Sequence, residues 1–222
     1  LPQHVVRPVA RGALIRVGQD EKSRWQITQM PLVEAAFVSI RPTDGMIYSL
    51  VGGFDFDRNK FNHVTQAFRQ PGSSFKPSVY DAASLSRKFT VESPVDDTRQ
   101  SFGGYTPNDY DNSYQGTLCL KTALDRSRNI PAVQTANRVG MGPVLDLATR
   151  MGIRDPLEPS LQTAIGGSPV TMFDHVQGYQ VFANNGLKEP LTGVVKVVDR
   201  SGNTIYDTGA KAPGTQVLTP AE

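Results

Sequence analysis

A chain of 222 residues can fold around one large core, or around one core with a small additional domain. Its 38% hydrophobic and 20% charged residues are typical of an ordinary globular protein, and a net charge of +2 with scattered Lys and Arg excludes a basic nucleic-acid-binding arm or stripe. The single cysteine, Cys119, excludes an internal disulfide and a cysteine-based zinc site. Because it lies in an apolar run, we expect a buried, unreactive thiol.

The first quarter of the chain predicts β-hairpins. Four strands are expected, at residues 13–17, 25–27, 33–40 and 46–51. The last two are joined by Pro42-Thr43-Asp44-Gly45, in which a leading Pro and a closing Asp-Gly are typical of a tight turn.

The rest of the chain predicts helices between two hairpins. Helices are expected at residues 73–88, 119–126, 131–139, 143–151 and 169–186. Ser168 is expected to cap the last of them, whose core face should carry Val170, Phe173, Val176, Tyr179 and Phe182. Residues 90–117 have no period and predict a long loop, and residues 194–206 predict a closing hairpin. This order favours an antiparallel sheet covered by helices, an α/β (α+β) fold.

Ser73-Ser74-Phe75-Lys76 is the first pattern that carries chemistry. Three residues apart on a helix, Ser73 and Lys76 lie on one face, one turn apart. A serine hydroxyl is a poor nucleophile until a base takes its proton, and a lysine kept neutral by its surroundings can be that base. Gly72 lets the backbone come close to a substrate.

Ser127-Arg128-Asn129 is the second pattern, and it follows 54 residues after Ser73 (127 − 73 = 54) between two expected helices. The hydroxyl of Ser127 can pass a proton to a leaving amine, and the amide of Asn129 can hold a substrate carbonyl. Ser-x-x-Lys and Ser-x-Asn are parts of a known three-motif set. Each pattern alone is common enough to occur on an ordinary surface helix or turn.

Longer blocks surround both patterns and are far more specific. They are VGGFD at 51–55, FNHVTQAFRQPGSSFKP at 61–77, YTPNDY at 105–110, SRNIPAV at 127–133, AIGGSPVT at 164–171 and FANNG at 182–186. Together they closely resemble the transpeptidase domain of the class A, bifunctional penicillin-binding proteins, over roughly residues 25–222.

The resemblance implies a role for each matching residue. Ser73 would be the acylated serine, Lys76 its base, Ser127 a proton shuttle and Asn129 a substrate-binding amide, with Gly72 beside them. Ser73 would attack the penultimate D-alanine carbonyl of a peptidoglycan stem peptide, and an amine of a neighbouring stem would resolve the acyl-enzyme into a cross-link. β-Lactam antibiotics would acylate the same serine, and no cofactor or metal is implied.

The resemblance also implies a fold, a location and a domain division. The fold would be the penicillin-recognising, β-lactamase-like one, without its C-terminal strands. Residues 1–30 would be either the last part of a small β (OB-like) domain, where the chain exits it, or a linker, and residues 31–222 would form the transpeptidase domain. The protein would work in the periplasm or on the outer face of the cell membrane. No stretch here approaches the roughly 18 apolar residues of a membrane helix, so any anchor would belong to a longer parent protein.

Two features depart from the family pattern. Asp109 stands where relatives usually carry Asn and Cys119 where Thr is common, and we expect little effect of either on the catalytic set. No Lys-Thr-Gly or Lys-Ser-Gly occurs in these 222 residues. We therefore expect a chain truncated before the third motif, with poor β-lactam binding and no measurable cross-linking by itself.

Several other residues are expected to have ordinary roles. Glu158 resembles the deacylating base of class A β-lactamases, but Gln162 replaces the Asn that should follow it, so a loop glutamate is expected. Tyr105, Tyr110 and Tyr114 should pack within their loop rather than line a groove. His4, His63 and His175 lack the spacing of a metal site or a Ser-His-Asp triad, and His175 should pack on its helix.

Three classes of function stay open at this point. The first is a DD-transpeptidase. The second is a serine hydrolase of the same superfamily, either a DD-carboxypeptidase or a β-lactamase. The third is an inactive scaffold or a sensor that recognises penicillin.

Overall fold

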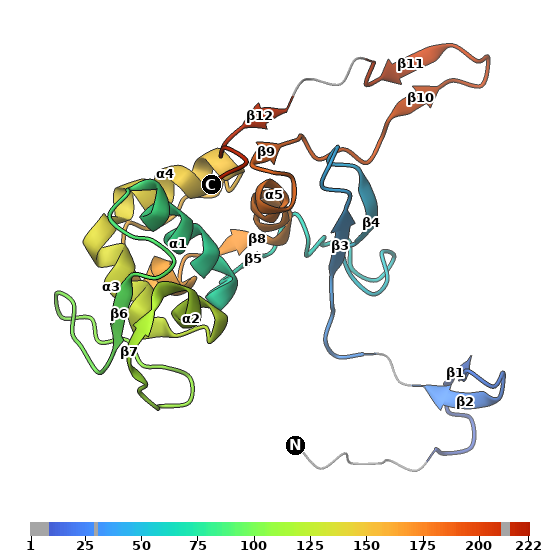
Figure 1. The fold of residues 1–222 in the computed structure, drawn as a ribbon. Helices are drawn as coiled ribbons and strands as arrows, with labels where there is room; N and C mark the ends of the chain where they lie inside the picture. Colours follow the sequence, from blue (N-terminus) through green and yellow to red (C-terminus); the bar gives the residue numbers. More distant parts are fainter. Residues whose placement is uncertain (1–8, 29–30, 210–213) are drawn as a thin grey trace. The chain divides into compact units, whose positions relative to one another are not determined.

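The structure, a computed structural model, describes residues 9–28, 31–209 and 214–222, and it divides into two compact units at residues 1–34 and 35–222 (Figure 1). The first unit contains one antiparallel hairpin of β1 (Arg16–Gln19) and β2 (Trp25–Thr28). The first strand was expected three residues earlier, and residues 1–8 and 29–30 of the predicted 1–30 segment lie outside the described residues. The Asp20 carboxylate accepts the backbone N–H groups of Lys22 and Arg24, at 2.9 Å each, and so fixes the turn between the two strands.

The second unit holds the other described strands, which form antiparallel two-stranded pairs. These are β3 (Phe37–Ile40) with β4 (Ile47–Val51), β5 (Phe68–Arg69) with β8 (Val170–Thr171), β6 (Pro94–Asp97) with β7 (Gly116–Cys119), β9 (Leu187–Lys188) with β12 (Thr215–Gln216), and β10 (Lys196–Val198) with β11 (Thr204–Asp207). The expected hairpins around Pro42–Gly45 and at residues 194–206 are both present. At Gly45, with φ +68°, an added Cβ would lie 2.3 Å from the Pro190 carbonyl oxygen, so the turn needs a glycine.

The helices of this unit surround one central helix, α1. They are η1 (Gly72–Phe75), α1 (Lys76–Leu85), α2 (Leu120–Asp125), α3 (Asn129–Val139), α4 (Met141–Met151), η2 (Leu161–Ile165) and α5 (Met172–Ala183). Val79 and Ala82 of α1 pack into a core with α3, α4, η2 and α5, whereas Tyr80 and Ala83 pack into a second core with α2, α3 and β6. Because α1 is buried on two sides, the residues at its N-terminus are held in a fixed place.

Three expectations about these elements were wrong. Residues 90–117 contain strand β6 and the first two residues of its partner β7, which the mixed sequence between them concealed. Helix α5 is capped by Thr171, whose hydroxyl accepts the backbone N–H of Asp174 at 3.2 Å, and not by Ser168, which is buried and bonded to Thr163. Tyr179 and Phe182 of α5 are 39% and 37% exposed, so the expected core face does not extend along the whole helix.

Candidate functional site

The turn that carries Ser73 is held by a close approach of two backbones. Gly72 has φ +59° and donates its N–H to the Gly166 carbonyl at 3.3 Å. Gly166 ends η2 in the left-handed conformation, and an added Cβ would lie 2.1 Å from the Gly72 carbonyl oxygen. No side chain larger than hydrogen fits there, so the glycines of the 164–171 block fix the start of the turn. Ser73 itself is exposed.

Lys76, one turn further on, is completely buried at the start of α1. Its Nζ donates hydrogen bonds to the Ser127 carbonyl oxygen at 2.5 Å, to Asn129 Oδ1 at 2.7 Å and to Ser127 Oγ at 3.2 Å. Burial lowers the pKa of Lys76 from 10.5 to about 8, against the opposing charge of Asp109. At pH 7 about a tenth of such a lysine is neutral and able to accept a proton.

Ser127 and Asn129 approach Lys76 from the connection between α2 and α3. Ser127 has φ +53°, a left-handed conformation that is uncommon for residues other than glycine and that turns its carbonyl toward Lys76. Asn129 is the first residue of α3, and its Nδ2 donates to the Asn108 carbonyl at 2.7 Å. The amide is therefore oriented by one bond at its nitrogen and another at its oxygen.

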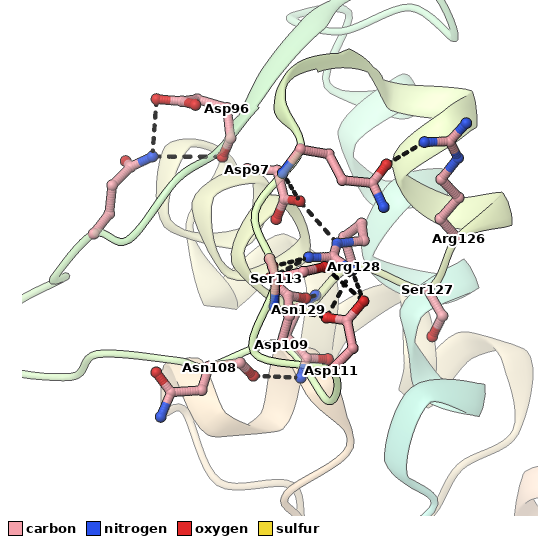
Figure 2. A network of polar contacts seen from close by, with 12 residues as sticks. Asp96, Asp97, Asn108, Asp109, Asp111, Ser113, Arg126, Ser127, Arg128 and Asn129 are labelled. Atoms are coloured by element: carbon pink, nitrogen blue, oxygen red, sulfur yellow. Dashed lines mark hydrogen bonds and ion pairs between the residues drawn. The ribbon is translucent and has the colours of Figure 1, made fainter.

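Between them, Arg128 points the other way into a buried cluster of aspartates (Figure 2). Its Nε donates to Asp97 Oδ2 at 2.8 Å, its Nη1 to both oxygens of Asp111 at 3.1 Å, and its Nη2 lies 3.4 Å from Asp109 Oδ2. The Nη2 group also donates to the Ser113 carbonyl. Burial opposes the charge, but the three carboxylates raise the pKa of Arg128 above its ordinary value.

Asp109 joins this cluster to the site. Its Oδ1 accepts the backbone N–H of Asn129 at 2.5 Å, and Asp109 is only 3% exposed. Burial and the neighbouring Asp97 raise the pKa of the Asp109 carboxyl, against the Asn129 N–H and Arg128. Asp109 was expected to have little effect. That expectation overlooked three aspartates within fifteen residues (97–111), close to an arginine inside the Ser-x-Asn motif, which was a signal in the sequence.

A pocket of about 440 Å³ opens over these residues. It is lined by Ser73, Asp109, Tyr110, Asp111, Arg126, Ser127, Arg128 and Asn129. The structure thus brings Lys76, Ser127 and Asn129 into direct contact and sets Ser73 on the wall of the same pocket. Within the described residues, Ser73 Oγ has no hydrogen bond to Lys76, and Gly72 is not among the lining residues.

The remaining candidate residues lie away from this pocket or differ from expectation. Tyr110 is fully exposed and lines the pocket, so packing within the loop was the wrong interpretation for it. Cys119 is half-buried rather than buried, with Sγ 3.1 Å from Thr122 Oγ1. Glu158 is an exposed loop residue, as expected. His175 Nε2 lies 2.8 Å from Ser74 Oγ and its ring meets Tyr179 edge-on.

The described residues contain neither a metal-binding cluster nor a membrane-spanning helix. No group of three or more His, Cys, Asp and Glu in residues 9–28, 31–209 and 214–222 is arranged to hold a metal ion. His4 lies outside these ranges. Across the same ranges, no helix is both long enough and apolar enough to cross a membrane.

Comparison with known proteins gives consistent matches. Residues 35–220 match the family described as the penicillin binding protein transpeptidase domain. Penicillin-binding protein 1A of Neisseria gonorrhoeae is 37% identical over 202 residues, which cover 87% of this chain and 25% of that protein. The same-named protein of Pseudomonas aeruginosa is 33% identical over 213 residues, 93% of this chain and 26% of that protein. The chain therefore spans about a quarter of the length of the curated relatives it matches.

Solved structures agree with these relatives. Penicillin-binding protein 1A from Haemophilus influenzae superposes with a TM-score of 0.79 at 30% identity, over 87% of this chain and 30% of that one. The penicillin-binding protein PonA1 from Mycobacterium tuberculosis superposes with a TM-score of 0.75 at 25% identity, over 84% of this chain and 52% of that one. PonA1 has also been solved in complex with penicillin V.

Proposed function

Because the chain belongs to the penicillin-binding protein transpeptidase family, we propose that it carries the acyl-enzyme site of a serine D-Ala-D-Ala transpeptidase. Ser73 is the residue that becomes acylated, by the penultimate D-alanine of a stem peptide or by a β-lactam. The observation that carries the proposal is the buried Lys76, whose pKa of about 8 leaves a neutral fraction near physiological pH.

The proposed reaction begins at Lys76. Its three hydrogen-bond acceptors use all three protons of the ammonium form, so the neutral amine gains a free lone pair when one proton leaves. That lone pair accepts the proton of Ser73 as Oγ bonds to the substrate carbonyl carbon. The bond from Lys76 to Ser127 Oγ is the longest of the three, and the hydroxyl can reverse it and donate instead. We therefore propose that Ser127 passes the proton from Lys76 to the leaving amine as the C–N bond breaks.

Asn129 is proposed to bind the substrate carbonyl or amide. Its side chain lines the pocket and is held at both ends, so it does not lose much rotamer freedom when substrate arrives. Gly72 is proposed to let the backbone before Ser73 pass close to Gly166, rather than to bind substrate directly.

Transfer to an amine is favoured here over hydrolysis. A β-lactamase-type hydrolase needs a base that activates water against the acyl-enzyme, and Glu158 is exposed and outside the residues that line the pocket. The Ser168 hydroxyl accepts its backbone N–H at 3.0 Å, which fixes Glu158 in the η2 loop.

We also propose the division and the location that the family implies. Residues 31–222 would be the transpeptidase part, working outside the cytoplasmic membrane, and residues 1–30 would connect it to a small β domain. A Lys-Thr-Gly strand, which these 222 residues do not contain, would complete the pocket in a longer form of the protein.

Labelled penicillin tests the function in a form extended beyond residue 222 and in the 222-residue chain. We expect the extended form to give a long-lived adduct on Ser73, located by mass spectrometry of peptides, and the short chain to give much less. Ser73→Ala should abolish the adduct. Ser74→Ala is the matched control, because Ser74 Oγ donates to the Pro71 carbonyl and contacts His175 instead of lining the pocket.

Two results contradict the proposal. An adduct that persists in Ser73→Ala excludes Ser73 as the nucleophile. Rapid turnover of penicillin, with no adduct that survives seconds to minutes, indicates a hydrolase. Cross-linking of a stem peptide to an added amine then distinguishes a transpeptidase from a sensor.

A further inference from the structure

The aspartates around Arg128 carry more negative charge than the buried site can balance. Asp97 is completely buried and Asp109 nearly so, and both contact a single guanidinium that also binds the half-exposed Asp111. If all three carboxyls were ionised, three negative charges would face one positive charge. Isolated carboxylates in a buried position are costly, so such a site tends to retain a proton.

The hydrogen bonds show where that proton belongs. Asp97 uses Oδ2 to accept from Arg128 Nε at 2.8 Å and from the backbone N–H of Gln115 at 3.0 Å. Asp109 uses Oδ1 to accept from the backbone N–H of Asn129. The other oxygen of each, Asp97 Oδ1 and Asp109 Oδ2, is buried and has no hydrogen-bond partner among the described residues, although Asp109 Oδ2 forms an ion pair with Arg128 Nη2 at 3.4 Å. Both carboxyls lie against the same guanidinium, Asp97 at Arg128 Nε and Asp109 at Arg128 Nη2, so one proton held by the pair would remove one of two buried negative charges that face a single cation.

We propose that Asp97 and Asp109 share one proton, and that Asp109 is thereby a positioning residue that holds Asn129 and sets the charge felt by Lys76. The proposal rests on the proposed function, because it assigns a role at the same acyl-transfer site. An Asn at position 109 would supply an N–H to Asp97 permanently, whereas Asp109 supplies one only while it holds the proton.

The groups that face Asp109 come from three sides. Asp97 comes from β6, Arg128 from the start of α3, and Lys76 and Tyr80 from α1. Burial keeps Tyr80 neutral by raising its pKa, and the two aspartates act in the same direction. The negative charge of Asp109 raises the pKa of Lys76, in opposition to burial, so the position of the shared proton changes how basic Lys76 is.

Two isosteric variants move this charge in opposite directions. In Asp109→Asn the pair keeps one charge, but it lies on Asp97, next to Arg128 Nε. In Asp97→Asn the one charge lies on Asp109, whose carboxylate acts on Lys76. In both variants the new amide supplies an N–H, and its oxygen can keep the bond that the carboxylate accepted, from Asn129 N–H at position 109 or from Arg128 Nε at position 97; Asp109→Asn loses only the longer ion pair with Arg128 Nη2.

The rate of labelled-penicillin acylation, measured against pH in the extended form, tests the proposal. The midpoint of the rise in acylation rate with pH should follow the pKa of Lys76. For Asp109→Asn, which removes the negative charge near Lys76, we expect this midpoint to fall by about one pH unit. For Asp97→Asn, which places the full charge on Asp109, we expect it to rise by about half a pH unit. Asp96→Asn is the matched control on the same strand, because among the described residues the Asp96 carboxylate accepts hydrogen bonds from Thr98 and Gln100, at 2.9 and 3.2 Å, and from neither Arg128 nor Asn129. Its profile should coincide with the wild type. A downward shift or no shift in Asp97→Asn contradicts the shared proton, and slower acylation without any shift in either variant contradicts the positioning role.

Thermal unfolding of the 222-residue chain tests the same proton without any acylation. Since the pKa of Asp109 is higher in the folded protein than in the unfolded chain, its contribution to stability is complete below about pH 4 and is lost as pH rises through the folded value. Asp109→Asn should remove that loss and Asp96→Asn should retain it. Equal pH dependence in these two variants overturns the shared proton. If this difference is present but no variant forms an adduct, the proposed function fails while the shared proton stands.

Discussion

Lys76 and Arg128 are two buried cations on opposite sides of one short segment, and they are surrounded in opposite ways. Lys76 meets a carbonyl, a hydroxyl and an amide, none of which is charged, and its pKa falls to about 8. Arg128 meets three carboxylates, and its pKa is raised further (Figure 2). Uncharged oxygens satisfy the N–H groups of a lysine without fixing its charge, so the proton can leave. Carboxylates fix the charge of an arginine, which then serves as a structural anchor.

The difference shows how the segment Ser127-Arg128-Asn129 can both anchor itself in the fold and surround a lysine that must lose its proton. Ser127 and Asn129 need to be held still while the proton on Lys76 moves between groups. The ion pairs of Arg128 fix the backbone of this segment on the side away from Lys76. Asp109 takes part in them and also accepts the backbone N–H of Asn129, so it fixes the position of Asn129. The comparison predicts that the two cations respond very differently to substitution.

The largest effect on stability is expected from Arg128→Ala. It leaves Asp97 and Asp109 buried without a cation, which should lower the free energy of unfolding by about 3–5 kcal/mol. Denaturant unfolding measures this loss. Arg126→Ala is the control two residues away, because the Arg126 side chain is exposed and contacts Gln115, so its cost should stay below about 1 kcal/mol. Equal losses in the two variants would mean that the aspartate cluster does not anchor the segment.

Gly166→Ala should cause the next largest loss of stability, through a steric clash at the turn that carries Ser73 rather than through an unpaired charge. The new Cβ needs space that the Gly72 backbone occupies, and φ +79° is strained for alanine, so we expect a loss of about 2–4 kcal/mol and much slower acylation. Gly142→Ala, in the exposed first turn of α4 with free space around it, is the control. It should be neutral or stabilising by up to about 1 kcal/mol. A Gly166→Ala variant as stable as that control contradicts the close approach.

Lys76→Met should abolish acylation and yet change stability at pH 7 by only about 1 kcal/mol or less, since a buried cation without a carboxylate partner adds little. The folded pKa of Lys76 is depressed, so the unfolded chain binds more protons between pH 8 and 10.5, and wild-type stability rises across that window. Unfolding of Lys76→Met should lack this rise. If Lys76→Met lowered the free energy of unfolding as much as Arg128→Ala does, the claim that Arg128 but not Lys76 is a structural anchor would be wrong.

Ser127→Gly should have the smallest effect on stability. Glycine adopts φ +53° without strain, so stability should be unchanged or higher by up to about 1 kcal/mol, while acylation slows because the hydroxyl is gone. Asn112→Gly, at an exposed left-handed residue with φ +52°, gives the stability change expected from the backbone alone. If Ser127→Gly acylates at the wild-type rate, the hydroxyl does not shuttle a proton.

The family was predicted through the resemblance of long blocks such as residues 61–77, and the α/β fold class also through the order of the expected hairpins and helices; both predictions are confirmed. The approach of Ser127 and Asn129 to Lys76 was predicted only through the resemblance, because a separation of 51 or 53 residues in the sequence says nothing about the distance between two side chains in space. The partners of Arg128 were missed for a related reason. Asp97 lies at the end of β6, whereas Asp109, Asp111 and Ser113 lie in the segment between β6 and β7, so the pairing of these two strands, which brings the partners together, depends on tertiary contacts rather than on local pattern.

Helix α5 shows the other limit. Its apolar residues recur at helical spacing, but its polar Asp174 and Gln180 are buried while Tyr179 and Phe182 are partly exposed. Asp174 is buried because it accepts the Arg154 backbone N–H and pairs with its guanidinium at 2.8 Å. Specific partners of this kind override periodicity.

The pH dependence of adduct formation at Ser73 tests the central claim most directly. Labelled penicillin would be added to the extended form between pH 5 and 10, and the rate of modification of Ser73 would be followed by mass spectrometry. With Lys76 as the base, the rate should rise through a midpoint near pH 8 and reach a plateau above it. A rate independent of pH over this range, or a midpoint near 10.5 as for an exposed lysine, would contradict the assignment of a buried, readily neutralised Lys76 as the base for Ser73.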